Sequence, residues 1–218
     1  MPFHDRIDAA RQLARELGRF AADRPVVLAV PRGAVPMGEA IARALGGELD
    51  VVLVRKLRAP FNPEFAVGAI DESGWCYVAE YAAGAGANAA YLEREKREQL
   101  ALLQRRRASY TPGRDALPVD GRVAIVVDDG LATGATMIAA LHSVAARKPK
   151  KLVCAVPVAS REALGKIAPY CDEVVCLESP ADFQAVGQFY AEFPQVDDRE
   201  VGEILRGFGQ PRKLEHPA

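Results

Sequence analysis

Residues 123–137 read VAIVVDDGLATGATM, and this stretch decides the fold of the 218-residue chain. An apolar run ends in two adjacent carboxylates, a turn rich in glycine and threonine follows, and a helical pattern then begins. This order predicts a buried strand that feeds a phosphate-sized loop at a helix N-terminus. Such a helix end offers free backbone N–H groups and the positive end of the helix dipole, and Thr133 and Thr136 add hydroxyl donors.

Asp128 and Asp129 would repel a phosphate, so we expect them to face another part of the same ligand. An ionised carboxylate only accepts hydrogen bonds, which suits a pair of neighbouring hydroxyl groups. Diol and phosphate together indicate a sugar phosphate, with ribose 5-phosphate as the simplest fit. The loop differs from a Walker A loop and from the dinucleotide-binding Gly-x-Gly-x-x-Gly turn.

The rest of the chain alternates between short apolar runs and helical patterns. This alternation predicts an α/β fold, a doubly wound, mainly parallel sheet covered on both faces in three layers. Ligands bind beyond the carboxyl ends of the strands in such sheets, where the chemically interesting residues of this chain fall. The expected strands are 26–30, 51–54, 123–127, 152–156 and 173–177, the expected helices are 4–23, 35–45, 88–109, 134–147, 161–168 and 197–206, and 65–70 with 75–78 predict a hairpin.

Length, composition and charge limit the class of protein. A chain of this size is most simply one domain, residues 1–218, and half of its residues are hydrophobic. A net charge of −1 does not favour a nucleic-acid partner or a membrane surface. The N-terminus lacks the apolar core of a signal peptide, so we expect a cytoplasmic protein with free thiols.

The stretch around the acidic pair resembles the signature of the type I phosphoribosyltransferases. Six positions match that signature one by one: Asp128, Asp129, Thr133, Gly134, Ala135 and Thr136. The resemblance implies that the two aspartates bind the ribose hydroxyls of 5-phosphoribosyl pyrophosphate (PRPP). It also implies that the following loop, Gly130, Leu131, Ala132, Thr133, Gly134, Ala135 and Thr136, holds the 5-phosphate. Gly130 departs from the apolar residue that often follows the acidic pair.

The same resemblance assigns the pyrophosphate end of PRPP. Arg32 and Gly33 follow the first strand, and in the family this loop contacts pyrophosphate, often through a cis peptide; an ordinary turn is the alternative. Lys56, taken as the end of the second strand, matches a basic residue of the family, or is a solvated lysine. The candidate catalytic residues are therefore Asp128, Asp129, Lys56 and Arg32. Mg²⁺ is expected through ligand oxygens, without a dedicated protein metal site.

Three further segments keep two interpretations each. Residues 62–68 form an expected loop that closes over PRPP, in which Glu64 binds a ligand or caps the loop. Arg105–Arg107 serve a lid or a neighbouring subunit, or are a solvated helix end. A small hood made by the N-terminal segment and residues 179–210 covers a core of residues 25–178, and its aromatic residues stack on a base or pack internally: Phe183, Phe189 and Tyr190.

The implied reaction is transfer of a 5-phosphoribosyl group from PRPP to a nitrogenous base, with release of pyrophosphate and a role in nucleotide salvage or synthesis. PRPP and the base are the expected partners, a homodimer is a further expectation, and the sequence does not name the base. The rival interpretations are a non-catalytic PRPP- or nucleotide-binding regulator and a scaffolding module. PRPP binding without turnover would favour the regulator, and no PRPP binding would favour the scaffold.

Overall fold

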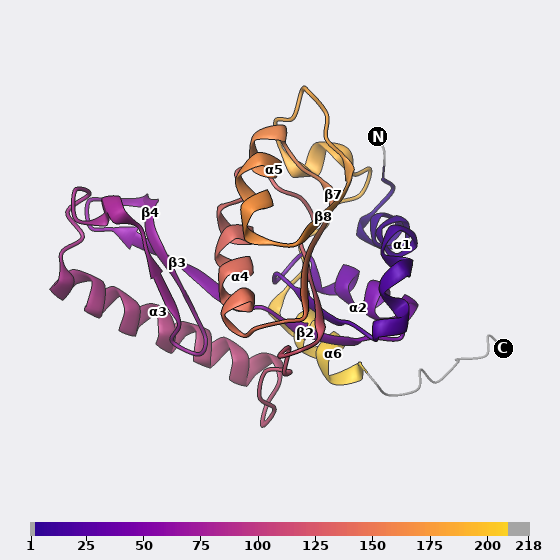
Figure 1. Cartoon of the computed structure of the whole chain (residues 1–218), viewed down its shortest axis with the longest axis horizontal. Coiled ribbons are helices and arrows are strands. Elements are labelled where there is room, and N and C mark those ends of the chain that lie inside the picture. Colours follow the sequence, from indigo (N-terminus) through magenta and orange to yellow (C-terminus); the bar gives the residue numbers. More distant parts are fainter. Residues whose placement is uncertain (1–2, 209–218) are drawn as a thin grey trace.

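The computed structural model describes residues 3–208, except for the side chains of Pro63 and Glu64. Its centre is a five-stranded parallel sheet, in the order β2-β1-β6-β7-β8 (Figure 1). The strands are β1 (Val26–Ala29), β2 (Glu48–Val51), β6 (Val123–Val127), β7 (Lys151–Val158) and β8 (Glu173–Glu178). Each of the two central strands β1 and β6 is buried along its whole length, as a parallel strand between two helical layers must be.

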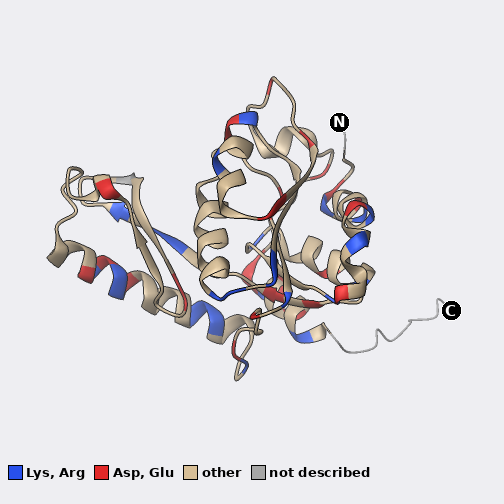
Figure 2. Ribbon diagram, viewed as in Figure 1, with Lys and Arg blue, Asp and Glu red and all other residues tan. Residues whose placement is uncertain are grey.

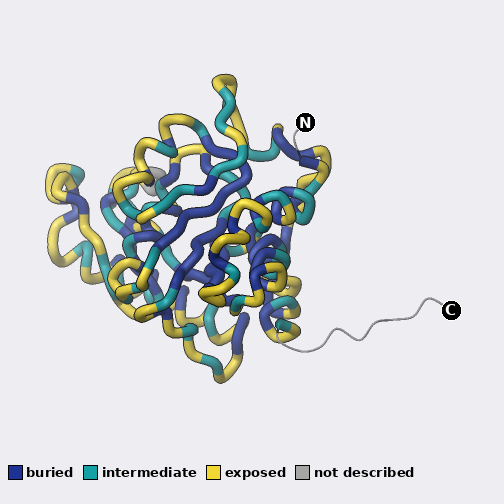
Figure 3. The backbone as a smooth tube through the Cα atoms, turned by 45° about the vertical axis from the view of Figure 1, so that its right-hand side comes forward, coloured by how far each residue is buried: buried dark blue, intermediate teal, exposed yellow. Residues whose placement is uncertain are grey.

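Helices cover both faces of this sheet, which makes the predicted three layers. Alternate residues of β1 and β6 face opposite sides: Val27 and Ile125 pack with one helical layer, while Leu28 and Val126 pack with the other. The first layer holds α1 (Arg6–Glu16), the 3-10 helix η1 (Leu17–Asp23) and α2 (Val35–Ala44); the second holds α4 (Ala135–Ala146), α5 (Arg161–Ile167) and η3 (Ala168–Tyr170). Figure 3 shows the sheet strands as a buried centre between more exposed helices.

The topology places two loops side by side at one edge of the sheet. β1 and β6 are neighbours, but the chain after β1 goes outward to β2, while the chain after β6 goes the other way to β7 and β8. The strand order therefore reverses between β1 and β6, and the two connections diverge above a crevice. The loop with Arg32 and the loop with the acidic pair both begin at this reversal point.

An arm projects from the sheet (Figure 1) and consists of a second, antiparallel sheet packed on a long helix. Its elements are β3 (Val54–Ala59), β4 (Asn62–Asp71), β5 (Cys76–Val78), η2 (Glu80–Ala82) and α3 (Ala89–Tyr110). The pairing of β4 with β5 confirms the predicted hairpin, and α3 confirms the predicted long helix. Two predictions are wrong: 51–54 is no single strand, and 62–68 belongs to β4 instead of a loop.

Both errors have the same physical cause. β2 ends at Val51 because its partner β1 ends at Ala29, with which Val51 is in register. The buried residues Val52 and Leu53 then carry the chain from one sheet to the other, so one apolar run contains the end of one strand and the start of another. β4 forms because β3 offers it an antiparallel partner that starts at Val54.

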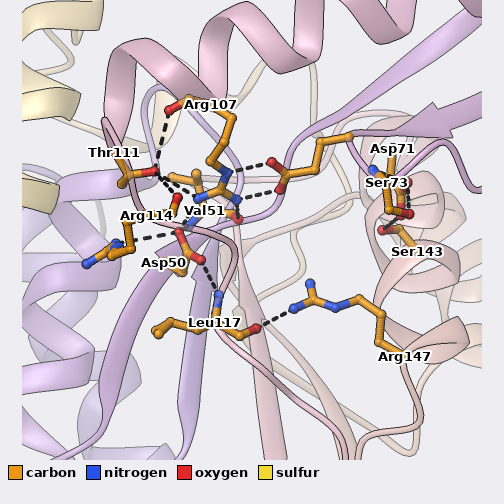
Figure 4. A network of polar contacts seen from close by, with 11 residues as sticks. Asp50, Val51, Asp71, Ser73, Arg107, Thr111, Arg114, Leu117, Ser143 and Arg147 are labelled. Atoms are coloured by element: carbon orange, nitrogen blue, oxygen red, sulfur yellow. Dashed lines mark hydrogen bonds and ion pairs between the residues drawn. The ribbon is translucent and has the colours of Figure 1, made fainter.

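A buried polar network ties the root of the arm to the parallel sheet (Figure 4). Asp50 of β2 is fully buried, and Arg107 of α3 donates to it at 2.6 Å. The same guanidinium contacts the carboxylate of Glu72, while Asp71 accepts a 2.6 Å hydrogen bond from the Ser143 hydroxyl of α4. Arg107 thus neutralises a carboxylate that water cannot reach and holds three parts of the chain together.

The C-terminal part returns to the N-terminus. After β8 the chain forms η4 (Val186–Phe189) and α6 (Asp198–Gly207), and Phe3 bridges to Tyr190. This contact joins the N-terminal segment to residues 186–194, and we call the two together the cover. α6 packs instead against α2 and α3, so a hood that includes all of 179–210 stays a prediction, and residues 209–210 lie outside the described part. Among residues 3–208, no helix has the length and apolar character needed to cross a bilayer. The four cysteines are free thiols.

Candidate functional site

The acidic pair lies directly after β6, at the point where the strand order reverses. Asp128 and Asp129 are both partly buried, and the backbone N–H of Asp129 donates to Asp128 Oδ1 at 2.9 Å. Burial raises the pKa of Asp128 well above its ordinary value, and the neighbouring negative charge of Asp129 raises it further. Burial also raises the pKa of Asp129, against the opposing effect of the Arg6 guanidinium. The site therefore holds two carboxylates that resist being charged together.

Arg6 of α1 holds Asp129 in place, although sequence reasoning did not assign it to the site. Its Nε donates to Asp129 Oδ2 at 3.0 Å and its Nη2 lies 2.9 Å from the same oxygen. Its Nη1 donates to the carbonyl oxygen of Pro194 at 2.6 Å, and the guanidinium stacks over the Phe193 ring at 3.7 Å. The sequence does carry a signal for it, since Arg6 occupies the same helical face as the buried Ala9, Ala10 and Leu13.

Tyr190 fixes the same aspartate from its backbone side. The Tyr190 hydroxyl donates to the carbonyl oxygen of Asp129 at 2.6 Å. Its ring lies in a row of aromatic side chains, 5.5 Å from the Phe3 ring and 4.7 Å from the Phe193 ring. The ring of Phe183 contacts that of Phe189 at 5.3 Å. Of the three aromatic residues that the sequence proposed for base stacking, Phe189 and Tyr190 are thus buried packing residues.

The loop after the acidic pair ends at an uncapped helix terminus. Gly134 is the N-cap of α4, with φ of 75°, and no side chain caps this helix end. The loop is braced from the next strand, since the N–H of Leu131 donates to Val158 at 3.0 Å and the Ser160 hydroxyl donates to Ala132 at 2.8 Å. Thr133 and Thr136 are exposed. A rigid loop with accessible hydroxyl groups at a free helix N-terminus suits a phosphate group.

Gly130 has a packing reason to lack a side chain. A Cβ at this position would lie 2.6 Å from a methyl carbon of Val186, in η4. The C-terminal cover therefore occupies the space in which the apolar residue common at this point of the signature would stand. This departure from the signature follows from the position of η4.

The loop after β1 brings Gly33 against the acidic pair. A Cβ on Gly33 would lie only 2.2 Å from Asp129 Oδ2, so the two loops meet at this point. The Pro31–Arg32 peptide bond is cis, as the resemblance implied. The Arg32 side chain is exposed and its Nη1 lies 3.8 Å from Asp198 Oδ2, at the start of α6.

The remaining candidates do not belong to the two loops that meet at the reversal point. Lys56 does not end the second strand of the parallel sheet; it is exposed within β3, at the base of the arm. The Glu64 side chain lies outside the described part of the structure. The three arginines at 105–107 lie in two different environments. Arg107 belongs to the buried network, while Arg105 and Arg106 line a surface pocket. For Arg107, the interpretation as a solvated helix end is wrong.

No group of three or more His, Cys, Asp or Glu side chains within the described part of the chain is arranged to hold a metal ion. The acidic pair offers at most a few carboxylate oxygens, and Asp129 already pairs with Arg6. This donor set fits a Mg²⁺ ion that arrives with ligand oxygens of its own, as Mg²⁺ commonly does at phosphate-bearing substrates.

In a comparison with protein families, this chain matches a family model over most of its length. The model of the phosphoribosyl transferase domain matches residues 3–193, which include the acidic pair, both loops and the segment of Tyr190.

Relatives of known sequence or structure support the same grouping. The Mycobacterium tuberculosis protein named "Putative phosphoribosyl transferase Rv0571c", of strain H37Rv, is 46% identical over 204 residues, as is its counterpart MT0597 in strain CDC 1551. These matches cover 93% of this chain but 46% of the mycobacterial proteins, so the chain spans about half the length of those relatives. The crystal structure of TT1426 from Thermus thermophilus is 47% identical, with a TM-score of 0.85, and the match covers 94% of this chain and 98% of that one.

Proposed function

This chain belongs to the phosphoribosyl transferase domain family, and we propose that it transfers the 5-phosphoribosyl group of PRPP to a nitrogenous base and releases pyrophosphate. The observation that carries the proposal is the meeting of two loops at the reversal point of the sheet. One loop presents a pair of partly buried carboxylates followed by a free helix N-terminus. The other presents Arg32 and touches the pair through Gly33.

The acidic pair suits the ribose of PRPP. A carboxylate accepts hydrogen bonds from the ribose hydroxyls, and Arg6 and Tyr190 fix the side chain and the backbone of Asp129 before the ligand arrives. Positive charge develops on the sugar as the bond to pyrophosphate breaks, as in glycoside chemistry. Fixed carboxylates beside the ring stabilise that charge without reorganising.

The two ends of PRPP have separate partners in this proposal. The loop from Gly130 to Thr136 holds the 5-phosphate through backbone N–H groups and threonine hydroxyls. Arg32, and Lys56 from the base of the arm, hold the leaving pyrophosphate. Asp128 and Asp129 could offer carboxylate oxygens to Mg²⁺, which would supply positive charge at the pyrophosphate when bound. The acceptor base would enter beside the cover formed by Phe3, Tyr190 and Phe193.

Calorimetric titration of PRPP with Mg²⁺ tests the proposal. We expect micromolar affinity for the native chain, about −8 kcal/mol, and its loss in the Asp128→Asn/Asp129→Asn variant. Pyrophosphate release with a panel of purine and pyrimidine bases then identifies the acceptor. Binding without release for any base would favour a PRPP-binding regulator. No PRPP binding by the native chain would refute the proposal, and binding of a nucleoside monophosphate alone would retain only the phosphate loop.

A further inference from the structure

A pocket of about 270 Å³ lies beside the proposed site, between the base of the arm and the start of α6. Its lining is unusually rich in positive charge for a protein of net charge −1. The lining residues are Arg55 of β3, Leu102, Leu103, Arg105, Arg106, Ser109 and Tyr110 of α3, and Asp198 of α6. Figure 2 shows the basic band at 105–107 on the part of α3 that approaches α6.

The three arginines of this pocket lack carboxylate partners among the described side chains. Arg55 donates to the Gln99 amide oxygen, and neither Arg105 nor Arg106 forms an ion pair with a described residue. Their neighbour Arg107, in contrast, is held by two carboxylates. Burial lowers the pKa of Arg55, and the positive charges of Arg106 and Arg58 lower it further, while the negative charge of Glu95 acts in the opposite direction. The cations crowded here are therefore only partly compensated.

The one carboxylate on the pocket wall is already engaged. Asp198 accepts a hydrogen bond from the Tyr110 hydroxyl and pairs with Arg32 at 3.8 Å. The lining therefore carries three positive charges against one negative charge that points partly toward Arg32. Such an imbalance draws an anion, and guanidinium groups match phosphoryl oxygens in geometry as well as charge.

We propose that this pocket is a second anion site, separate from the acidic-pair site, and that it binds the phosphoryl groups of a small phosphorylated molecule. Its volume admits a diphosphate or a compact phosphorylated metabolite and is below that of most cofactor clefts. The existence of the site does not depend on the proposed transferase activity. The effect of the bound anion on catalysis does rest on that proposed activity. An anion held by Arg105 and Arg106 would change the electrostatic field around Asp198 and therefore the ion pair of Asp198 with Arg32.

The probe is inorganic pyrophosphate, titrated calorimetrically into the full chain without Mg²⁺. We expect the Arg105→Gln/Arg106→Gln variant to bind it at least about tenfold more weakly, a change of about 1.4 kcal/mol. The matched control is Arg94→Gln/Arg97→Gln, which removes two exposed charges from the same helix outside the pocket. The Arg32→Gln variant removes a cation that the proposed function assigns to the leaving pyrophosphate, and it should retain the pocket's pyrophosphate binding.

If the pocket variant and the control lose pyrophosphate affinity equally, the anion responds only to the overall positive charge of the helix. That result would overturn the proposed site. Loss of all pyrophosphate binding in the Arg32→Gln variant would mean that Arg105 and Arg106 serve the proposed transferase site, and would overturn the separateness of the pocket. A native chain that binds pyrophosphate but not PRPP would refute the transferase proposal alone. ADP in place of pyrophosphate distinguishes a free diphosphate ligand from a nucleotide.

Asp198→Asn gives a test in the opposite direction. It removes the single negative charge of the lining, so we expect about two- to fivefold tighter pyrophosphate binding, in line with a partly exposed charge. Hydrogen exchange on the native chain adds a readout that needs no variant. Pyrophosphate should protect residues 102–110 and 198–201, and unchanged exchange in both segments would contradict the proposal.

Discussion

At the residue scale, Gly33 links the two loops of the proposed site because it leaves room for the Asp129 carboxylate. A methyl group there would stand 2.2 Å from Asp129 Oδ2 and 3.1 Å from Arg6 Nη2. Neither partner can retreat freely, since the Arg6 guanidinium also contacts Pro194 and Phe193.

We therefore expect Gly33→Ala to weaken PRPP binding by about tenfold or more, through displacement of Asp129, while the chain stays folded. Titration calorimetry measures the affinity and thermal unfolding monitors the fold. Gly18→Ala is the matched control, because a Cβ at Gly18 meets no atom within 4 Å. If both variants bind PRPP like the native chain, the contact between the two loops is not what positions Asp129.

Asp128 shows a conflict between stability and binding at the level of one side chain. The folded chain raises the pKa of this carboxyl, mainly by burial, above the unfolded value of about 3.9. Its contribution to stability is therefore present below about pH 4 and is lost as pH rises through the folded pKa. An amide keeps the hydrogen bond from the Asp129 N–H without the charge.

We therefore expect Asp128→Asn to raise the free energy of unfolding at neutral pH. Above about pH 4 the variant should also lose less stability than the native chain as pH rises, because it has no carboxyl group to ionise at this position. Urea unfolding across this pH range measures the effect, with PRPP binding expected to fall in the same variant. Asp120→Asn, at an exposed turn position, is the control. If the native chain instead becomes more stable relative to the Asn variant as pH rises, the pKa of Asp128 is lowered on folding. That result would refute burial as the dominant effect on this carboxyl.

At the element scale, the arm depends on Arg107 for its attachment. This side chain contacts Asp50 of β2 at 2.6 Å, the Val51 carbonyl oxygen at 3.1 Å and the Glu72 carboxylate. Asp50 also accepts the N–H of Leu117 at 2.8 Å, so its charge is fixed where water is excluded.

Arg107→Ala would leave the buried charge of Asp50 without its main partner, which typically costs about 3–5 kcal/mol. We expect a loss of roughly 3 kcal/mol in the free energy of unfolding by urea, because Arg114 lies 3.8 Å from Asp50 and offsets part of it. Arg97→Ala on the exposed face of the same helix should change stability by less than about 0.5 kcal/mol. Equal effects of the two substitutions would mean that the network does not anchor the arm.

The periodicity of the sequence predicts an element when neighbouring residues specify it. It fails when pairing with a strand elsewhere in the chain sets where the element begins or ends. The strand at 123–127, its loop and α4 are specified by adjacent residues, so the sequence predicted them correctly. The boundary inside 51–54 depends on where β1 ends, and β4 depends on β3 as its partner. Arg6 lies 123 positions from Asp129, and no local spacing can predict that contact.

At the scale of the whole molecule, the N-terminal segment around Phe3 meets the segment around Tyr190 beside the acidic pair. The N-terminal residues hydrogen-bond to the end of η4 and the segment after it. Phe3 N–H donates to the Phe189 carbonyl oxygen at 3.2 Å, Ala191 N–H to that of Phe3 at 3.0 Å, and Glu192 N–H to that of His4 at 2.8 Å. Arg6 and Tyr190 connect this cover to Asp129. Order in the cover and geometry in the proposed site should therefore be coupled.

Arg6→Gln separates this coupling from overall stability. Loss of the ion pair and of the Pro194 hydrogen bond removes about 1–3 kcal/mol of local stabilisation, because a partly buried carboxylate remains behind. We expect amide exchange at Phe3, Ala191 and Glu192 to become roughly tenfold faster, since each step of about 1.4 kcal/mol is a factor of ten.

The Val30 amide, bonded to Val127 at 2.9 Å within the sheet, should exchange as in the native chain. Arg11→Gln on the exposed face of α1 is the matched control. Faster exchange at Val30 as well would indicate global destabilisation, and unchanged exchange at all four amides would show that the acidic pair does not hold the cover closed.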